Sequence, residues 1–255
     1  MTRPMIRRMQ TLAAIVLLVI SGAVFAATEL ELLHANNDLD SKESLQRGAR
    51  NFMNYCSGCH SAEYVRYNTV ARGLDLTEDP VIENLMFNAE KIHETIERTM
   101  PAEGAARWFG KSPPDLTLMA RSKSADYIYS FLKGFYLEEG SPTGVNNLYL
   151  AGTSMPHVLW ELEGFKKAVY HEGEPNSEGV SAEVFDSFEP VTEGYMSEED
   201  YDLFVRDTVN FLAYISEPVR STRRVLGVWV LLFLSFFLII AIMLKKQIWK
   251  DVPKN

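Results

Sequence analysis

Two long apolar runs interrupt an otherwise mixed pattern of hydrophobic and polar positions along the chain. The first, residues 12–25, follows three arginines and ends just before the small residues Ala26 and Ala27. A basic start, a short apolar run and small residues after it are typical of a secretory signal peptide. We therefore predict a signal peptide over residues 1–26, cleaved after Ala26 or nearby. The alternative is an uncleaved N-terminal anchor.

The second apolar run, residues 225–244, contains no charged residue across its 20 positions. As a helix it would be about 30 Å long, which is the thickness of the hydrocarbon core of a bilayer. Basic residues lie on both sides of the run, and Trp249 follows it as an interfacial anchor. We predict a transmembrane helix with its flanks over 220–246 rather than a buried helix of a soluble protein, and a cytoplasmic tail over 247–255.

A shorter amphipathic pattern precedes the two cysteines of the chain. Apolar residues recur there at intervals of three and four, the spacing of one helix face: Leu45, Ala49, Phe52 and Met53. Asp40, with Glu43 three residues later, is typical of a capped helix start. The pattern predicts a helix that runs from Asp40 toward Cys56, although the stripe alone would also fit a core helix without a cofactor.

The composition, 47% hydrophobic and 23% charged over 255 residues, is that of a globular protein and excludes a disordered, collagen-like or polytopic membrane chain. Residues 27–219 carry 15 basic and 33 acidic residues, which gives them a net charge of −18. A domain this acidic is unsuited to nucleic acid and attracts a basic partner. Eleven of its acids, with no Lys or Arg among them, lie from Glu172 to Asp202. Taken alone, such a run is more typical of a solvated loop.

Both cysteines fall in the pattern Cys-x-x-Cys-His over residues 56–60, the pattern of covalent haem attachment. Cys56 and Cys59 can each form a thioether with one vinyl group of a haem, and His60 can then ligate the iron. Positions i, i+3 and i+4 lie on one side of a helix, which suits this geometry. A single motif predicts one covalently attached haem c.

Three other uses of the cysteine pair fit less well. A thiol–disulfide oxidoreductase places the pair in a strand–helix context, and no strand pattern precedes Tyr55. A zinc site needs about four ligands, and the sequence has no second pair of Cys or His. A disulfide across two residues closes a very small loop and constrains little. Export supports haem, since haem is attached on that side of the membrane.

The sixth position of the iron is either open or filled by a second residue. Methionine in that position raises the reduction potential and makes an electron carrier. Two downstream methionines, Met100 and Met155, are each followed by proline, which restricts the backbone where a loop must hold a sulfur. Residues 152–154 before Met155 indicate such a loop, which favours Met155 without excluding Met100.

Several further motifs follow one another in a characteristic order. They are Tyr55-Cys56-Ser57-Gly58-Cys59-His60-Ser61, Pro113-Pro114-Asp115-Leu116, Asp126-Tyr127 with Gly134-Phe135, Pro142-Thr143-Gly144-Val145 and Met155-Pro156, ahead of one membrane helix with a Lys-rich end. From about Leu45 to the C-terminus, the chain thereby resembles the cytochrome c1 family, the haem subunits of the quinol–cytochrome c reductase (cytochrome bc1 complex).

The resemblance implies a role for individual residues. The haem set consists of Cys56 and Cys59 as covalent attachment points, with His60 and Met155 as axial ligands of the iron. Arg121 would pair with a haem propionate, Tyr127 would be an aromatic residue of the haem pocket, and residues 113–114 would lie against the haem edge. The chain departs from mitochondrial members at residues 108–110, Trp-Phe-Gly, where those carry small and amide residues.

The resemblance also implies a fold, a role in electron transfer and a cellular location. The fold would be mainly α, a cytochrome c-like haem domain over residues 27–219 with a single C-terminal transmembrane helix. The chain would be no enzyme on its own but an electron-transfer subunit, passing single electrons from the Rieske iron–sulfur protein to a c-type cytochrome beside cytochrome b. A bacterial-type signal peptide indicates a bacterial inner membrane, with the haem domain in the periplasm and the C-terminus in the cytoplasm.

Three other functions stay open at this point. The chain could be a membrane-tethered electron shuttle outside the reductase. It could be a haem sensor with an open iron position, which requires that Met155 does not ligate. It could also be a membrane-anchored thiol–disulfide oxidoreductase, which would carry no covalent haem.

Overall fold

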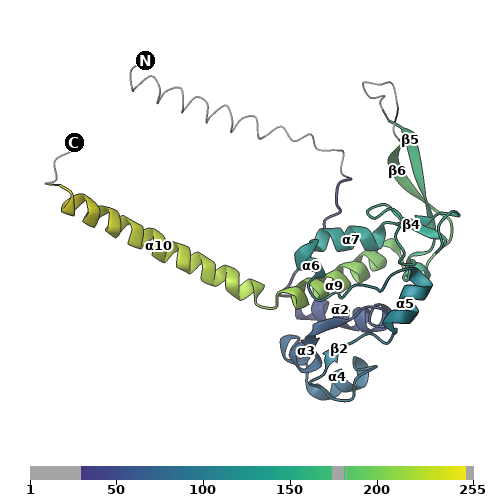
Figure 1. Ribbon diagram of the computed structural model, residues 1–255, viewed down its shortest axis with the longest axis horizontal. Coiled ribbons are helices and arrows are strands. Elements are labelled where there is room, and N and C mark those ends of the chain that lie inside the picture. The colour runs from purple at the N-terminus through teal and green to yellow at the C-terminus, as the bar shows by residue number, and fades with distance from the viewer. Residues whose placement is uncertain (1–29, 174–180, 182, 251–255) are drawn as a thin grey trace. The chain divides into compact units, whose positions relative to one another are not determined.

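The computed structural model describes residues 30–173, 181 and 183–250, and the elements named below lie within residues 32–255 (Figure 1). The predicted signal peptide lies outside the described residues, as do positions 251–255 of the predicted tail. The described helices are α2 (Lys42–Tyr55), α3 (Tyr67–Gly73), α4 (Glu78–Asn84), α5 (Ala102–Phe109), α6 (Met119–Ser122), α7 (Ala125–Lys133), α8 (Trp160–Glu163), α9 (Glu198–Ser216) and α10 (Arg220–Ile248).

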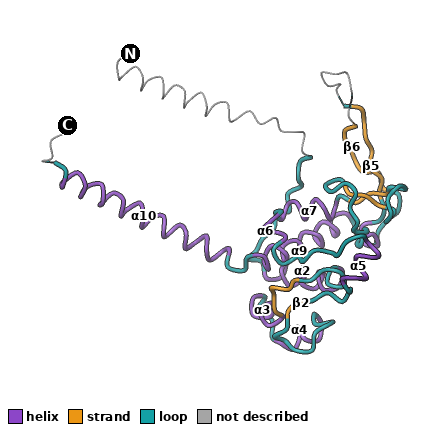
Figure 2. Tube along the Cα trace, in the orientation of Figure 1, coloured by secondary structure: helices purple, strands orange, loops and turns teal. Residues whose placement is uncertain are grey.

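The strands within the described residues are short and pair as three antiparallel two-stranded sheets. These are β1 (Ala62–Arg66) with β2 (Thr95–Ile96), β3 (Phe135–Leu137) with β4 (Val145–Asn147), and β5 (Lys166–Glu172) with β6 (Glu183–Pro190). Helices account for most of the regular structure along the trace (Figure 2). The mainly α fold predicted from the sequence is therefore confirmed.

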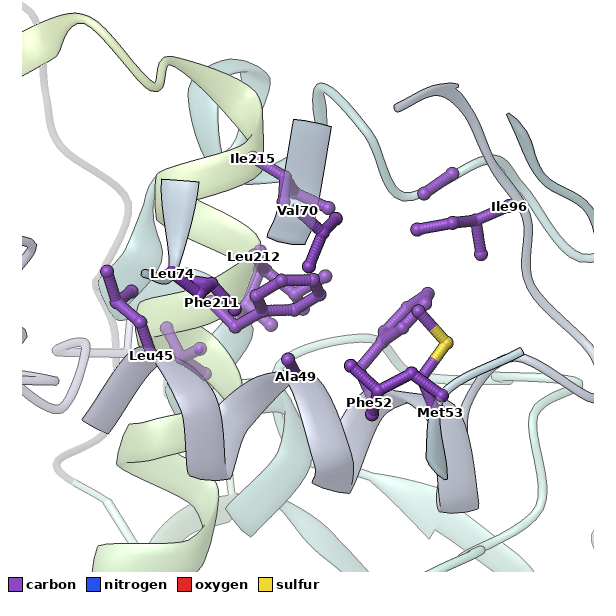
Figure 3. Close-up of a cluster of buried hydrophobic side chains, with 14 of the residues drawn as sticks. Leu45, Ala49, Phe52, Met53, Val70, Leu74, Ile96, Phe211, Leu212 and Ile215 are labelled. Atoms are coloured by element: carbon purple, nitrogen blue, oxygen red, sulfur yellow. The ribbon is translucent and has the colours of Figure 1, made fainter. Parts of the chain in front are cut away.

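The core lies between α2 and α9, which pack along one another although about 150 residues of sequence separate them. The predicted apolar stripe of α2 is buried, and it faces the apolar side of α9, as Figure 3 shows. The rings of Phe52 and Phe211 meet with their centroids 5.7 Å apart, and both side chains are fully buried. Burying each aromatic side chain contributes about 1.5–3 kcal/mol relative to leaving it exposed.

The two helices approach most closely at Gly48. A Cβ added there would lie 2.0 Å from the carbonyl oxygen of Asp207 and 2.8 Å from the Cβ of Phe211. The glycine thus lets the backbone of α2 lie directly against α9, a close approach that any side chain at this position would prevent.

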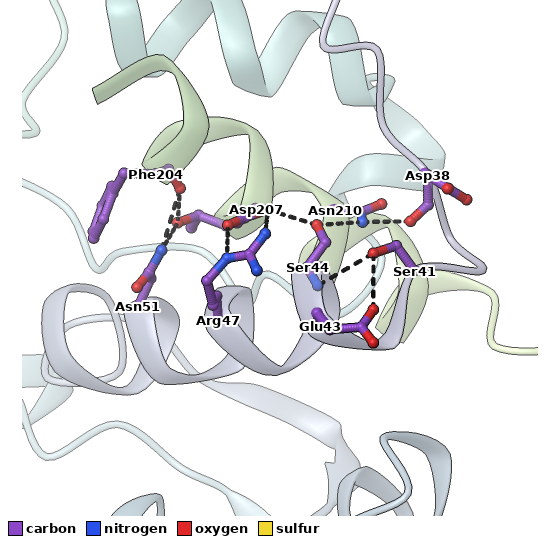
Figure 4. A network of polar contacts seen from close by, with 10 residues as sticks. Asp38, Ser41, Glu43, Ser44, Arg47, Asn51, Phe204, Asp207 and Asn210 are labelled. Carbon is purple, nitrogen blue, oxygen red and sulfur yellow. Dashed lines mark hydrogen bonds and ion pairs between the residues drawn. The ribbon is translucent and has the colours of Figure 1, made fainter. Parts of the chain in front are cut away.

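A polar network crosses the same interface (Figure 4). The carboxylate of Asp207, only 2% exposed, accepts hydrogen bonds from Ser44 Oγ at 2.6 Å and from Arg47 Nε at 2.5 Å. Nearby, the Asn51 amide donates to the carbonyl oxygen of Phe204 at 3.2 Å. A buried carboxylate is tolerated only when it is paired in this way, so the network also defines how α2 and α9 are aligned.

The start of α2 differs from the prediction. The N-cap is Ser41, in extended conformation, whose Oγ accepts a hydrogen bond from the Ser44 backbone N–H at 3.4 Å. Asp40 lies one residue too early and instead donates its own backbone N–H to the side chain of Asp38. Capping depends on which residue leaves the helical backbone conformation, and either Asp or Ser can serve. The predicted cap at Asp40 is therefore wrong by one position.

The acidic stretch from Glu172 to Asp202 is not a loop throughout, contrary to the interpretation of that run taken alone. Residues 183–190 of it form strand β6, which pairs with β5 (Figure 1). Three of its last four acids lie in the first turn of α9, at the end where the helix dipole favours negative charge: Glu198, Glu199 and Asp200.

The predicted transmembrane run lies inside α10. Among the described residues this is the one helix long and apolar enough to cross a membrane, and none of its residues is buried. A helix so apolar on every side matches a lipid environment rather than an aqueous one.

Candidate haem site

A cavity of about 350 Å³ opens beside the C-terminal end of α2. This volume falls within the roughly 300–1,000 Å³ typical of sites for small ligands. Five separate segments of the chain line it with mostly apolar side chains: residues 55–60, 109–119, 123–132, 150–158 and 208–212. The lining therefore joins the cysteine motif to elements that are distant in sequence.

The C-terminus of α2 presents the cysteine motif to this cavity. The helical bonding continues past Tyr55, since the backbone N–H groups of Cys56 and Ser57 both donate to the Phe52 carbonyl oxygen. The N–H groups of Cys59 and His60 in turn donate to the Cys56 carbonyl, at 3.0 and 2.9 Å. This compact turn places both thiols and the imidazole in the lining, as the i, i+3, i+4 spacing led us to expect.

A contact with the proline loop orients the imidazole of His60. Its Nδ1 lies 2.8 Å from the carbonyl oxygen of Pro114. A carbonyl can only accept, so Nδ1 carries the proton and the lone pair of Nε2 remains free for a metal. Burial lowers the pKa of His60, which keeps the ring neutral near pH 7. The proline loop is itself held, because Arg98 donates to the carbonyl oxygen of Pro113 at 3.0 Å.

Both thiols lie in surroundings that disfavour the thiolate. Burial raises the pKa of Cys56 to about 12 and raises the pKa of Cys59 above its ordinary value. No disulfide joins the two cysteines, both of which lie in the described part of the chain. Thiol–disulfide oxidoreductases depend on a lowered thiol pKa. A function as a thiol–disulfide oxidoreductase is therefore disfavoured by this environment as well as by the helix that precedes the motif.

The cavity distinguishes the two Met-Pro sequences. Met155 lines it, on a loop that turns at Gly152 with φ of +70°. Met100 is not among the lining residues of the described chain, and its backbone N–H donates to the Gly58 carbonyl outside the cavity wall. Met119 also lines the cavity, but its sulfur lies 3.9 Å from the hydroxyl of Ser122. Of the two Met-Pro sequences, therefore, only Met155 lines the cavity among the described residues, together with Met119.

Two further predicted residues take different places. Tyr127 lines the cavity and its ring stacks with that of Phe131, at 6.3 Å between centroids. Arg121, on α6, is exposed and is not among the described residues that line the cavity. Lys123, two residues later, does line the cavity, and its Nζ lies 5.8 Å from the centroid of the Tyr127 ring. Pairing of Arg121 with a propionate stays a prediction.

Several lining residues escaped the sequence analysis. Lys111 and Lys123 line the cavity but belong to no recognisable sequence pattern. Thr208 and Leu212 come from α9, about 150 residues after the cysteine motif, with no local pattern that links them to it. Within residues 108–110, where the chain departs from mitochondrial family members, Phe109 lines the cavity whereas Trp108 is 62% exposed. Phe109 gives the lining an apolar contact at this position.

The cavity fits a haem held from α2. Its lining is mostly apolar, and two thiols and an imidazole lie together on one segment. The Nε2 atom of that imidazole, in His60, is free to bind a metal. With the helical fold and the apolar helix α10, these features define a membrane-anchored protein of the c-type cytochrome class.

Comparison with known proteins shows to which family of c-type cytochromes the chain is similar. The model of the cytochrome C1 family matches residues 34–252. The chain is 44% identical over 246 residues to cytochrome c1 of Allochromatium vinosum, covering 94% of this chain and 98% of that protein. It is 38% identical over 224 residues to a protein of Nitrosomonas europaea named ammonia monooxygenase gamma subunit, covering 88% and 90%. It is 27% identical over 235 residues to the mitochondrial cytochrome c1 haem protein of Saccharomyces cerevisiae, covering 82% and 67%.

The chain therefore belongs to the cytochrome c1 family, which confirms the resemblance found in its sequence. As a member it is a haem protein of electron transport and a subunit of the cytochrome bc1 complex, complex III of the respiratory chain.

Proposed function

We propose that this chain carries single electrons from the Rieske iron–sulfur protein to a c-type cytochrome, as the c1 subunit of a bacterial ubiquinol–cytochrome c reductase. The observation that carries the proposal is the shared lining of one cavity by the cysteine motif and by Met155. When bound there, haem c supplies one-electron exchange between its ferric and ferrous states.

Each residue of the set has a distinct part in this proposal. Cys56 and Cys59 hold one haem by thioether bonds, so the group cannot leave between turnovers. His60 and Met155 would supply the two protein ligands of the iron. The contact from His60 Nδ1 to the Pro114 carbonyl would keep the ring oriented toward the iron. With both ligands supplied by the protein, no substrate would bind to the iron, and the electron transfer would be outer-sphere.

The proposed organisation follows the sequence. Residues 1–26 are a signal peptide, 27–219 the periplasmic haem domain, 220–246 the transmembrane helix with its flanks, and 247–255 a cytoplasmic tail. Orientation follows from the signal peptide, since the basic residues that flank α10 are balanced. Cytochrome b is the neighbour in the bilayer, and the acidic haem domain attracts a basic cytochrome acceptor.

Carbon monoxide binding tests the proposal. The full-length chain, matured in a host that attaches haem and purified in detergent, is reduced and exposed to the gas. An unchanged spectrum means that both axial positions are filled, as an electron carrier requires. Prompt binding would mean an open iron position, and the haem sensor would then replace the proposal.

Two further observations distinguish the reductase subunit from a thiol–disulfide oxidoreductase and from a tethered shuttle. Haem that stays with the chain on a denaturing gel indicates covalent attachment and eliminates the thiol–disulfide oxidoreductase. Copurification of cytochrome b and the Rieske protein with a tagged chain identifies the reductase subunit, whereas a tethered shuttle would purify without them.

A further inference from the structure

The loop that carries Met155 has a side directed away from the cavity. Met155, Pro156 and Val158 line the cavity, whereas His157 is not among the lining residues of the described chain. The side chain of His157 is instead 4% exposed and packs into the protein behind the loop. A histidine two positions from a candidate ligand is therefore buried on the opposite side of the same segment.

The surroundings of His157 are both aromatic and charged. Its ring stacks on Phe135 with centroids 5.1 Å apart and an interplanar angle of 8°. Its Nε2 lies 3.0 Å from Oε2 of Glu163, a short contact that is not aligned as a hydrogen bond. Its Nδ1 has no hydrogen-bond partner among the described residues. A hydrocarbon ring would fill this space without burying an unpaired nitrogen, so packing alone does not account for the imidazole.

Glu163 is held in place by further contacts. Its other carboxylate oxygen pairs with the ammonium group of Lys166, and both side chains are nearly buried. Lys166 Nζ also donates to the carbonyl oxygen of Lys133 at 2.7 Å. Lys133 ends α7, whose residues Tyr127 and Phe131 line the cavity. The buried contacts therefore connect the back of the Met155 loop to another wall of the same cavity.

Glu163 also stands on backbone that cannot shift easily. A Cβ added at Gly164, where φ is +88°, would lie 2.1 Å from the carbonyl oxygen of Thr192. A Cβ at Gly194 would lie 2.2 Å from the carbonyl oxygen of Leu162. These two glycines allow the backbone at the end of α8 to pack closely against the segment before α9. This close packing restricts the position of the Glu163 carboxylate.

We propose that His157 is a positioning residue: its contact with Glu163 holds the loop so that the Met155 sulfur faces the iron. The inference rests on the proposed function, because it takes Met155 as the axial ligand. His157 itself touches neither the cavity nor the reacting group, and it acts through the backbone of the loop.

The test compares variants of the full-length, haem-loaded chain in detergent. His157→Phe keeps the aromatic stack and loses the contact with Glu163. Glu163→Gln weakens the same contact from α8. His157→Gln keeps a polar group toward Glu163, and His171→Ala removes a histidine that is exposed on β5. The readouts are carbon monoxide association with the reduced protein, the reduction potential, and the weak far-red band of methionine–iron ligation in the oxidised protein.

We expect His157→Phe to associate with carbon monoxide at least about tenfold faster than the unchanged protein, the scale of effects seen when outer contacts of a metal ligand are removed. Its far-red band should weaken and its reduction potential fall. Glu163→Gln should move the same three readouts in the same direction. His157→Gln should stay close to the unchanged protein, and His171→Ala should match it.

The outcomes separate this inference from the proposed function. Wild-type readouts in both His157→Phe and Glu163→Gln overturn the inference, as does a His157→Gln variant as perturbed as His157→Phe. Met155→Leu is the reference: if it leaves the far-red band and carbon monoxide binding unchanged, the ligand assignment itself fails. If Met155→Leu changes them and the variants at 157 and 163 do not, only the positioning role fails.

Discussion

Gly48→Ala tests the close approach of α2 and α9. The added methyl group would lie 2.0 Å from a backbone oxygen of α9, about 1 Å or more inside ordinary contact, so the helices must separate. Overpacking of a filled core costs about 1–3 kcal/mol, and a clash with backbone belongs at the upper end of that range. Alanine recovers about 1 kcal/mol through its better helix propensity. The net expectation is a free energy of unfolding lower by about 2 kcal/mol.

The assay is urea unfolding followed by helix circular dichroism, with the shift in midpoint at constant slope converted to free energy. Gly104→Ala, in α5, is the matched control, because the atoms nearest to its added methyl group belong to the ring of Trp108, an exposed side chain that can move. The control should be neutral or slightly stabilising. A Gly48→Ala midpoint equal to or above that of the unchanged protein would refute the close-packing argument.

Three further outcomes are expected. Arg47→Met leaves the buried carboxylate of Asp207 without its cation and should lower the free energy of unfolding by about 2 kcal/mol in the same assay, less than for a fully buried pair, because Arg47 is 43% exposed and the Ser44 hydroxyl remains. An unchanged midpoint would contradict this. Met155→Leu should lower the reduction potential and open the iron to carbon monoxide, whereas Met119→Leu, also in the cavity lining, should do neither. The reverse pattern would transfer the ligand role to Met119. Electron transfer to a basic cytochrome should slow as salt is raised, measured by stopped-flow absorbance, because the acidic domain steers the encounter. A rate independent of salt would remove the steering argument.

Much of the candidate site could be predicted because it is local. The cysteine motif lies within five residues at the end of a helix, so the spacing alone brings both thiols and His60 to one side. The helix stripe that begins at Leu45 and the 20-residue apolar run at 225–244 are equally local, and both appear as predicted. The cap at Asp40 was wrong by one residue, because adjacent residues of similar capping ability are distinguished only by backbone conformation.

What the sequence determined by itself is therefore the mainly helical class, the apolar helix α10 and the haem-attachment motif, each encoded by spacing within a short segment. The tertiary structure decided which of two Met-Pro loops reaches the cavity, that the Pro114 carbonyl orients His60, and that α9 completes the lining. It also placed His157 against Glu163 behind the loop. These relations join residues across the chain, and they arise from the close packing of α2 on α9 and of α8 on its neighbouring backbone. Such contacts leave no periodic pattern in the local sequence, because they form between distant segments only when the folded chain packs them together.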